Sequence, residues 1–188
     1  MRRVVVTGLG VVSSIGNNAE EVTKSLKNGT SGITFSDEHR DMGFRSHIHG
    51  SIKLEPSDYI DRKLLRFMGN GASYAYIAME QAIKDAGLEE SEVSNPSTGL
   101  IIGSGGPSTS NMMSAFDLAR EKGPKRVGPY MVPRVMSSTT SATLSTSFKI
   151  KGLSYSILEI LQVSQLELKR DLKCVIVIMN LRIFQKER

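Results

Sequence analysis

Short apolar runs alternate with helix-like segments along most of this sequence, and this alternation constrains the fold more than any other feature. The strand-like runs are residues 3–7, 99–108, 153–157 and 172–179. Strands that alternate with helices predict an α/β architecture. A chain of 188 residues is long enough for one domain with a hydrophobic core.

Residues 17–29 carry the signals of a helix with defined ends. Asn18 is the expected N-cap, Glu20 and Glu21 lie in the first turn, and Gly29 follows the last turn.

The segment 70–87 is the clearest helix in the sequence. It carries an apolar stripe at helical spacing and ends at a glycine that is the expected C-cap. The stripe and its C-cap are Ala75, Met79, Ala82, Ile83 and Gly87. The alanines and methionine predict close helix packing. A second helix, rich in Ser, Thr and Ala, is expected near 137–148, after a Pro-rich loop.

A glycine loop is expected directly after the first strand, which residues 3–7 are predicted to form. Its spacing does not fit a dinucleotide-binding loop, because Ser13 stands where the third glycine would be. Residues 30–36 are predicted to be turn-like, so no acidic residue ends a second strand at the required distance.

Composition narrows the classes of function. The formal net charge is +5, but aromatic residues are only 6% and no long basic run occurs, so nucleic acid is not an expected partner. An acidic protein partner, or an ordinary solvated surface, remains open. No apolar stretch approaches the roughly 18 residues of a membrane span. The single cysteine, Cys174, excludes an internal disulfide and favours a cytoplasmic location.

The histidines lie close together in sequence, at His39, His47 and His49. His47 and His49 would share one face of a strand and could form a metal pair. No further Cys or His completes a site, so a polar edge strand is the favoured interpretation and no metal or cofactor is predicted.

The stretch "KGLSYSILEILQ", residues 151–162, predicts a strand that turns into a helix. Such a turn is a common position for a nucleophile, because the helix N-terminus stabilises negative charge. Yet residues 158–163 contain no Cys, Ser, Thr or Lys. A helix-like pattern continues over 157–170.

Eight motifs are dispersed along the chain, and together, in this order, they resemble one enzyme family. They are "VVVTGLGVVSSIGNN", "GTSGITFS", "RSHIHGSIKL", "IDRKLLRFM", "MEQAIKDAGL", "GLIIGSGG", "VGPYMVPRVMSSTTSA" and "FKIKGLSYSI". Residues 1–157 resemble the N-terminal half of the β-ketoacyl-acyl carrier protein synthase I family, condensing enzymes of bacterial fatty-acid synthesis. The resemblance implies a thiolase-like α/β fold of layered αβαβα type, here incomplete, and a homodimer. Residues 158–188 are expected to be a divergent tail.

The same resemblance implies that the catalytic nucleophile is absent. In the family, "YSI" leads into Ser-Ser-Ala-Cys, and the cysteine position corresponds to Leu161. Leucine cannot form a thioester, and Cys174 is a poor substitute. The two histidines and the lysine of the family's second half are also expected to be missing. A frame disruption, a chimeric gene and genuine divergence all remain open as origins.

The resemblance also implies that two sets of residues retain a function. The first set would dock the acidic acyl carrier protein: Arg62, Lys63, Arg66, Lys122 and Lys125. The second would lie at the acyl pocket and dimer interface: Val135, Met136, Ser137 and Ser138. Ordinary surface charge and plain helix packing are the respective alternatives.

The expected function is that of a synthase fragment, whose parent activity extends acyl-carrier protein with malonyl-carrier protein. As written, the chain is expected to be inactive. A non-catalytic module that binds acyl carrier protein or a synthase partner is the alternative, and a nucleotide-binding α/β protein is a third. If half of a layered fold is absent, the helices near 71–86 and 137–148 should each leave one face uncovered, and the chain should self-associate.

Overall fold

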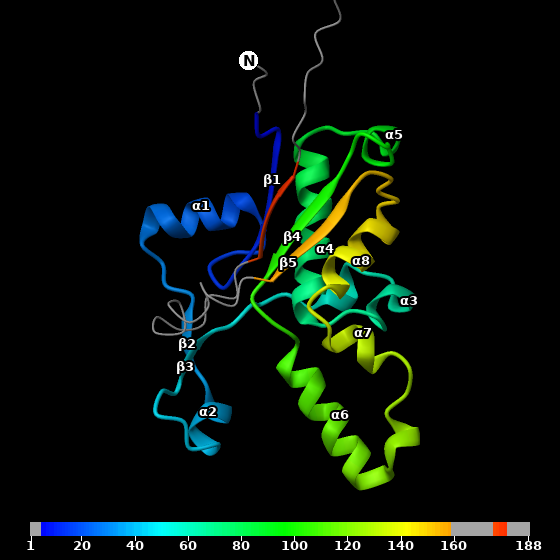
Figure 1. The fold of residues 1–188 in the computed structure, drawn as a ribbon. Coiled ribbons are helices and arrows are strands. Elements are labelled where there is room, and N and C mark those ends of the chain that lie inside the picture. The colour runs from blue at the N-terminus through cyan, green and yellow to red at the C-terminus, as the bar shows by residue number, and fades with distance from the viewer. Residues whose placement is uncertain (1–4, 159–174, 180–188) are drawn as a thin grey trace, which may run out of the picture.

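The computed structural model describes residues 5–158 and 175–179 (Figure 1). Its strands are β1 (Gly8–Val12), β2 (Ile33–Phe35), β3 (Ile48–Gly50), β4 (Leu100–Ser104), β5 (Ser154–Leu158) and β6 (Val175–Met179). Its helices are α1 (Ala19–Asn28), α2 (Asp37–Asp41), α3 (Arg62–Leu65), α4 (Asn70–Asp85), α5 (Glu90–Val93), α6 (Thr109–Lys122), α7 (Met131–Val135) and α8 (Thr139–Ser147). Two 3₁₀ turns, η1 (Pro56–Asp58) and η2 (Pro124–Arg126), complete the set.

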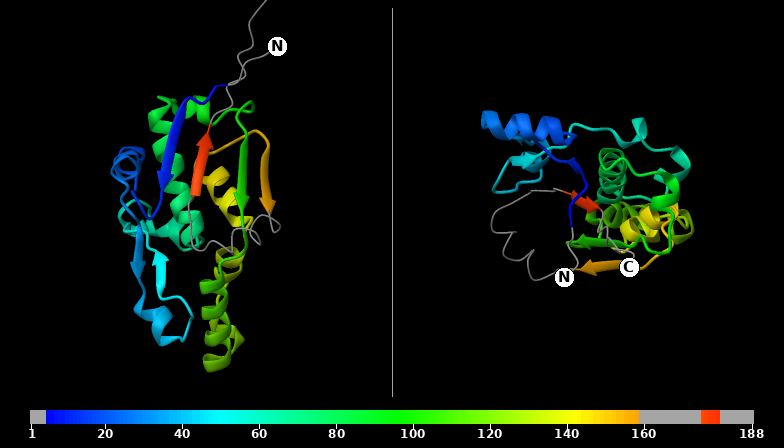
Figure 2. Two further views of the ribbon diagram at one scale, coloured as in Figure 1. Left: turned by 90° about the vertical axis from the view of Figure 1, so that its left-hand side faces the viewer. Right: turned by 90° about the horizontal axis from the view of Figure 1, so that it is seen from above.

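Four strands lie side by side against α4 and α8. β1 pairs with β6 in antiparallel fashion, and β4 pairs with β5 in parallel fashion. Figures 1 and 2 show the order β1, β6, β4, β5 across this face. β2 and β3 form a separate antiparallel pair that carries α2 between them. The predicted α/β architecture is confirmed, and the strand-like 172–179 contains β6.

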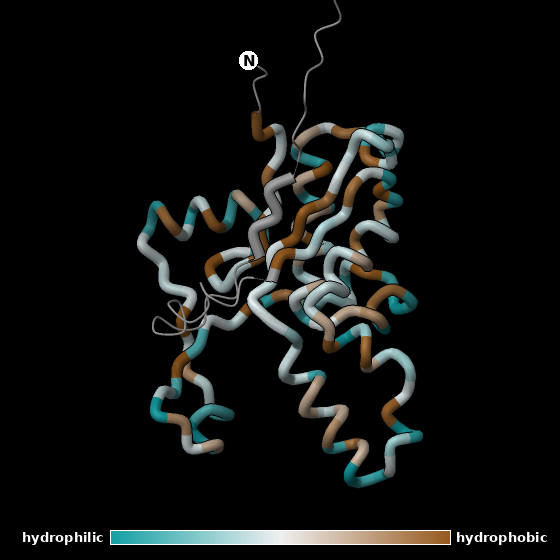
Figure 3. Tube along the Cα trace, viewed as in Figure 1, coloured by the Kyte–Doolittle hydropathy of each residue, from teal (hydrophilic) through white to brown (hydrophobic). Residues whose placement is uncertain are grey.

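Helix α4 forms the centre of the core, as its apolar stripe predicts. Ala75, Ala78 and Met79 have no exposed surface, and Ala82 is 1% exposed. The helix meets buried residues of β4 and α8, and Figure 3 shows hydrophobic residues along β4 at this contact. Gly87 adopts φ 62° just after the helix, which is the left-handed conformation expected at a C-terminus.

Helix α1 begins and ends where the sequence predicts. The side chain of Asn18 accepts a hydrogen bond from the Glu21 amide at 2.9 Å, and Gly29 adopts φ 62°. The helix fully buries no residue, and Leu26 is 68% exposed. Its ends are therefore fixed by local capping more than by tertiary packing.

Residues 5–7 form no strand, contrary to the strand predicted over 3–7, and β1 lies in the predicted glycine loop. Val5 and Val6 are exposed. Gly8 and Gly10 face α4 so closely that a Cβ atom on Gly10 would lie 1.7 Å from the Ala78 carbonyl oxygen. The glycines thus allow the strand backbone to rest directly on the helix.

The free edge of β1 is bonded by side chains of α4. The Leu9 amide donates to Asp85 Oδ2 at 2.9 Å, and the Val11 amide donates to Gln81 Oε1 at 3.1 Å. Gln81 Nε2 in turn donates to the Asn17 carbonyl at 2.7 Å. Asp85 and Gln81, which are one helical turn apart, therefore accept the backbone hydrogen bonds that a neighbouring strand would otherwise accept.

Three further elements differ from the sequence predictions. Residues 30–36 are not wholly turn-like, because β2 pairs with β3. Helix α6 was not predicted. Pro133, expected in a loop, lies within the short helix α7. The helix predicted over 157–170 does not begin at residue 157, because Ile157 and Leu158 belong to β5, and its remaining residues lie outside the described residues.

Exposed apolar side chains lie on one face of β1, β4 and β5, whereas the exposed positions of α4 carry none. Exposed positions of α4 are polar or glycine: Asn70, Gly71, Glu80, Lys84 and Asp85. On β1, β4, β5 and the residue before β5, the large exposed apolar side chains are Leu9, Ile101, Leu153, Tyr155 and Ile157. Because residues alternate along a strand, these side chains point away from α4 and α8. The exposed face of residues 71–86 is therefore polar and not apolar, and residues 137–148 expose the small side chains Ala142 and Thr146. Within the described ranges, no helix is long and apolar enough to cross a bilayer.

Candidate functional site

The first basic group lies on the short helix α3. Asp61 is the N-cap of this helix, because its side chain accepts a hydrogen bond from the Lys63 amide at 2.6 Å. Arg62 and Lys63 are exposed. Their positive charges therefore face solvent, where a partner could approach.

Arg66, the C-cap of α3, is held in place by neighbouring groups. Its Nε donates to the Lys63 carbonyl at 3.0 Å, and one terminal nitrogen donates to the Tyr130 hydroxyl at 3.3 Å. Its guanidinium carbon lies 5.5 Å from the Tyr130 ring centre and 5.8 Å from that of Phe67. Arg66 thus differs from its two exposed neighbours in α3.

The second basic group lies where α6 ends. Lys122 is the last residue of α6, and Gly123 turns the chain with φ 85° into η2, which contains Lys125. Both lysines are exposed. In Figure 1 this end of α6 is the part of the described chain furthest from the strands.

A side chain of α7 also bonds the backbone at the end of α3. Arg134 Nε donates to the Arg66 carbonyl at 2.9 Å. The Ser108 amide donates to the Val135 carbonyl at 2.9 Å, which ties the start of α6 to the end of α7. The structure therefore connects both predicted basic groups through α7, although they are far apart in sequence.

The residues predicted for the acyl pocket occupy the junction between α7 and α8. Val135 ends α7, and Met136 is 52% exposed. The Ser138 carbonyl accepts a hydrogen bond from Ser141 Oγ at 3.0 Å. Ser137 is half-buried. An exposed methionine beside partly buried serines suits a surface that another element covers.

The predicted strand before the nucleophile position is present as β5. Ser156 Oγ hydrogen-bonds with Ser141 Oγ of α8, which shows that the serines of β5 face the helix layer. Leu161, at the predicted nucleophile position, and Cys174 lie outside the described residues. The continuous described segment, residues 5–158, ends three residues before position 161.

The histidines pack as rings against each other and against phenylalanines. The ring centres of His39 and His49 are 5.4 Å apart, and those of His39 and Phe44 are 5.2 Å apart. His47 lies just before β3 and packs 5.9 Å from Phe35. In residues 5–158 and 175–179, no cluster of three or more His, Cys, Asp or Glu could hold a metal ion.

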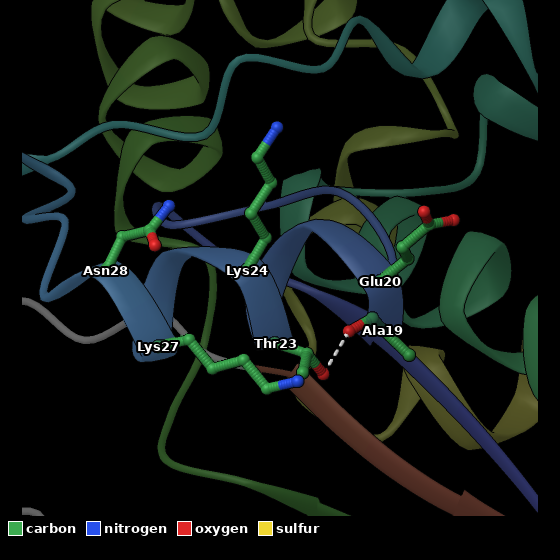
Figure 4. A pocket seen from close by; sticks show the side chains of 6 residues that line it. All are labelled: Ala19, Glu20, Thr23, Lys24, Lys27 and Asn28. Carbon is green, nitrogen blue, oxygen red and sulfur yellow. Dashed lines mark hydrogen bonds between the residues drawn. The ribbon is translucent and has the colours of Figure 1, made fainter.

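A shallow depression on α1 has no features of a binding site. Its lining residues, drawn in Figure 4, are Ala19, Glu20, Thr23, Lys24, Lys27 and Asn28. All belong to one helix, and the Thr23 hydroxyl is bonded within that helix to the Ala19 carbonyl at 2.7 Å. Polar groups from different elements do not converge there.

Ionisable groups with shifted pKa values lie outside the two basic groups. Glu80 on α4 is exposed as a residue, but partial desolvation of its carboxyl raises the pKa, and a hydrogen bond with Tyr76 opposes this shift. Burial, followed by the nearby Glu80 charge, raises the pKa of Tyr76. A hydrogen bond from Lys149 at 2.6 Å lowers the pKa of Glu90.

Comparison with known families decides the classification. Residues 1–158 match the family described as β-ketoacyl synthase, N-terminal domain. The chain belongs to this family. This confirms the resemblance that the eight motifs indicate.

Curated β-ketoacyl synthases resemble the chain over most of its length. It is 54% identical over 158 residues to 3-oxoacyl-[acyl-carrier-protein] synthase 1 of Haemophilus influenzae, covering 84% of this chain and 39% of that protein. It is equally identical over 159 residues to the synthase 1 of Escherichia coli strain K12, with the same coverage. The chain therefore spans about two fifths of the length of these relatives.

Solved ketosynthase structures share the fold. The ishigamide ketosynthase/chain length factor aligns with a TM-score of 0.75 at 26% identity, covering 84% of this chain and 40% of that one. A β-ketoacyl synthase from Burkholderia phymatum aligns with a TM-score of 0.70 at 22% identity, covering 84% and 39%. A type II ketosynthase in complex with its acyl-carrier protein aligns with a TM-score of 0.65 at 20% identity, covering 86% and 42%. The expected thiolase-like α/β fold, incomplete in this chain, is confirmed.

Sequence reasoning missed the residues that hold Arg66. Phe67 lies in the motif "IDRKLLRFM", Tyr130 and Arg134 lie in "VGPYMVPRVMSSTTSA", and 64 positions separate Arg66 from Tyr130. No local pattern could have joined them, because the contact arises only when α3 and α7 pack together.

Proposed function

We propose that this β-ketoacyl synthase chain supplies the carrier-protein docking surface of a 3-oxoacyl-[acyl-carrier-protein] synthase. The reaction would be the decarboxylative Claisen condensation of acyl- with malonyl-carrier protein in fatty-acid synthesis. The observation that carries the proposal is the pair of exposed cations, Arg62 and Lys63, on a helix capped by Asp61. The 54% identity to synthase 1 proteins supports the assignment.

The docking surface comprises the five predicted cations: Arg62, Lys63, Arg66, Lys122 and Lys125. Separated positive charges can steer an acidic helical protein and align its phosphopantetheine arm. A structural relative is described as a ketosynthase in complex with an acyl-carrier protein, which supports an acyl-carrier protein as the proposed partner.

We further propose that the chain as written does not catalyse the condensation. The reaction needs a thiolate to hold the acyl group and donors to stabilise the enolate. Position 161 holds leucine, which cannot form a thioester. The alternative, a non-catalytic module that binds carrier protein or a synthase partner, is favoured by the same leucine.

A homodimer and a cytoplasmic location complete the proposal. The exposed Val132 and Met136 lie beside the predicted interface residues Val135, Ser137 and Ser138. Association would cover these apolar side chains. The single cysteine in the sequence supports a reducing compartment.

The docking proposal is tested by titrating the purified 188-residue chain with holo-acyl carrier protein. The Arg62→Glu/Lys63→Glu variant should bind about tenfold more weakly at low salt, because it places like charges opposite the carrier. The matched control is Lys24→Glu/Lys27→Glu on α1, which makes the same change of net charge. Equal weakening by both double variants would show that net charge alone matters and would remove the proposed surface.

A further inference from the structure

Arg66 has the contacts of a structural clamp, although it carries the same charge as its neighbours. Two of its donor groups are engaged, one by the Lys63 carbonyl and one by the Tyr130 hydroxyl. Its guanidinium lies within 6 Å of both the Tyr130 and the Phe67 ring centres. This is the range of a cation–π interaction, which arginine makes with its planar face.

The groups around Arg66 also bind one another. The Phe67 and Tyr130 rings meet edge to face with centres 5.0 Å apart. Arg134 Nε bonds the Arg66 carbonyl, so α7 contacts the end of α3 through both backbone and side chains. Tyr130 is the N-cap of α7 and follows the turn that contains Lys125.

We propose that Arg66 is a positioning residue, which locks α3 to the segment between η2 and α7. It thereby holds Arg62 and Lys63 at a fixed separation from Lys122 and Lys125. The consequence for docking rests on the proposed function, because it assumes that both groups contact one carrier protein. Cations that are fixed before binding need not be ordered during binding, so the clamp raises the affinity for the carrier in addition to any contact that Arg66 itself makes with it.

Lysine cannot replace arginine in this role. A lysine at position 66 would keep the charge but lose the planar fork that stacks on two rings and reaches the Tyr130 hydroxyl. Arg66→Lys therefore separates the clamp from the charge. Tyr130→Phe is the complementary change, because it keeps the ring and removes only the hydroxyl.

The first measurement is limited trypsin cleavage of the 188-residue chain after Lys125 and Arg126, followed by mass spectrometry. Arg66→Lys should accelerate this cleavage about five- to tenfold and Tyr130→Phe about two- to threefold, from the interactions lost. The Arg66→Lys/Tyr130→Phe double variant should be cleaved at the same rate as Arg66→Lys alone. Cleavage at Lys24 on α1 should not change, and Arg120→Lys is the conservative control variant. Unchanged cleavage in both clamp variants would overturn the proposal.

The second measurement is binding of holo-acyl carrier protein across a salt series. Arg66→Lys and Tyr130→Phe should both weaken binding several-fold, with the slope of log affinity against log salt unchanged. Weakening by Arg66→Lys with unchanged binding by Tyr130→Phe would mean that Arg66 acts through direct contact with the carrier and not by positioning its neighbours, which overturns the positioning role. If the wild-type chain binds no carrier protein, the proposed function fails, and the cleavage rates still decide the clamp. Should Arg66→Lys lose its circular dichroism signal, the milder Tyr130→Phe decides both measurements.

Discussion

Alanine at Gly10 directly perturbs the contact between β1 and α4. The new Cβ atom would lie 1.7 Å from the Ala78 carbonyl oxygen, 2.7 Å from the Ala78 carbonyl carbon and 2.9 Å from the Ala82 nitrogen. All three are backbone atoms of a helix, so none can rotate away. The strand must therefore move off the helix.

The cost follows from the contacts that this movement disturbs. Overpacking of this kind destabilises a protein by about 1–3 kcal/mol. Displacing β1 also weakens the bonds of Val11 to Gln81 and of Leu9 to Asp85, at about 1 kcal/mol each. Alanine recovers about 0.4–1 kcal/mol by restricting the unfolded chain. The net loss should be about 2–4 kcal/mol, which lowers the unfolding temperature by about 5–15 °C.

The measurement is thermal and urea unfolding followed by circular dichroism. Gly103→Ala is the matched control, because Gly103 lies in β4 and a Cβ atom added there would meet no other atom within 4 Å. It should change stability by less than about 1 kcal/mol. Equal unfolding temperatures for the two variants would refute the direct packing of β1 on α4.

Three further outcomes are expected. An acyl label from acyl-carrier protein should leave no thioester on the chain, because Leu161 occupies the nucleophile position; mass spectrometric detection of label on Cys174 would contradict this. The raised pKa of Glu80 means that its stabilising effect is present at low pH and is lost as pH rises through that pKa. Glu80→Gln should therefore flatten the fall in unfolding free energy above about pH 4.5, and an unchanged slope counts against the shift. The wild-type chain should self-associate and bind a hydrophobic dye through the exposed sheet face, and Ile101→Lys should reduce both; a monodisperse chain without dye binding argues against this surface.

Elements with local signals were predictable from the sequence. The Asn18 cap and the Gly29 terminus of α1 are short-range interactions, so they form wherever those residues occur in that order. The stripe of α4 was equally clear, because burial on one face requires apolar residues at helical spacing.

Elements defined by distant contacts were not predictable in the same way. β1 was misplaced because glycine normally weakens a strand, and only the approach of α4 makes Gly8 and Gly10 suitable. Helix α6 buries no residue, so its sequence carries no strong apolar stripe. Of the five predicted docking cations, Arg62, Lys63, Lys122 and Lys125 are exposed, and their docking role stays a prediction. The contacts of Arg66 could not be predicted, because its partner Tyr130 comes from another part of the chain.

The packing of β1 on α4 has a consequence for synthesis of the chain on the ribosome. The bonds from Leu9 to Asp85 and from Val11 to Gln81 join residues 76 and 70 positions apart. At roughly 5–20 residues per second, the strand waits about 4–14 s before its helix has been made. During that interval Val12, which has no exposed surface in the finished fold, is open to solvent. A nascent chain arrested before residue 85 should therefore bind chaperones more strongly than one that has completed and released α4.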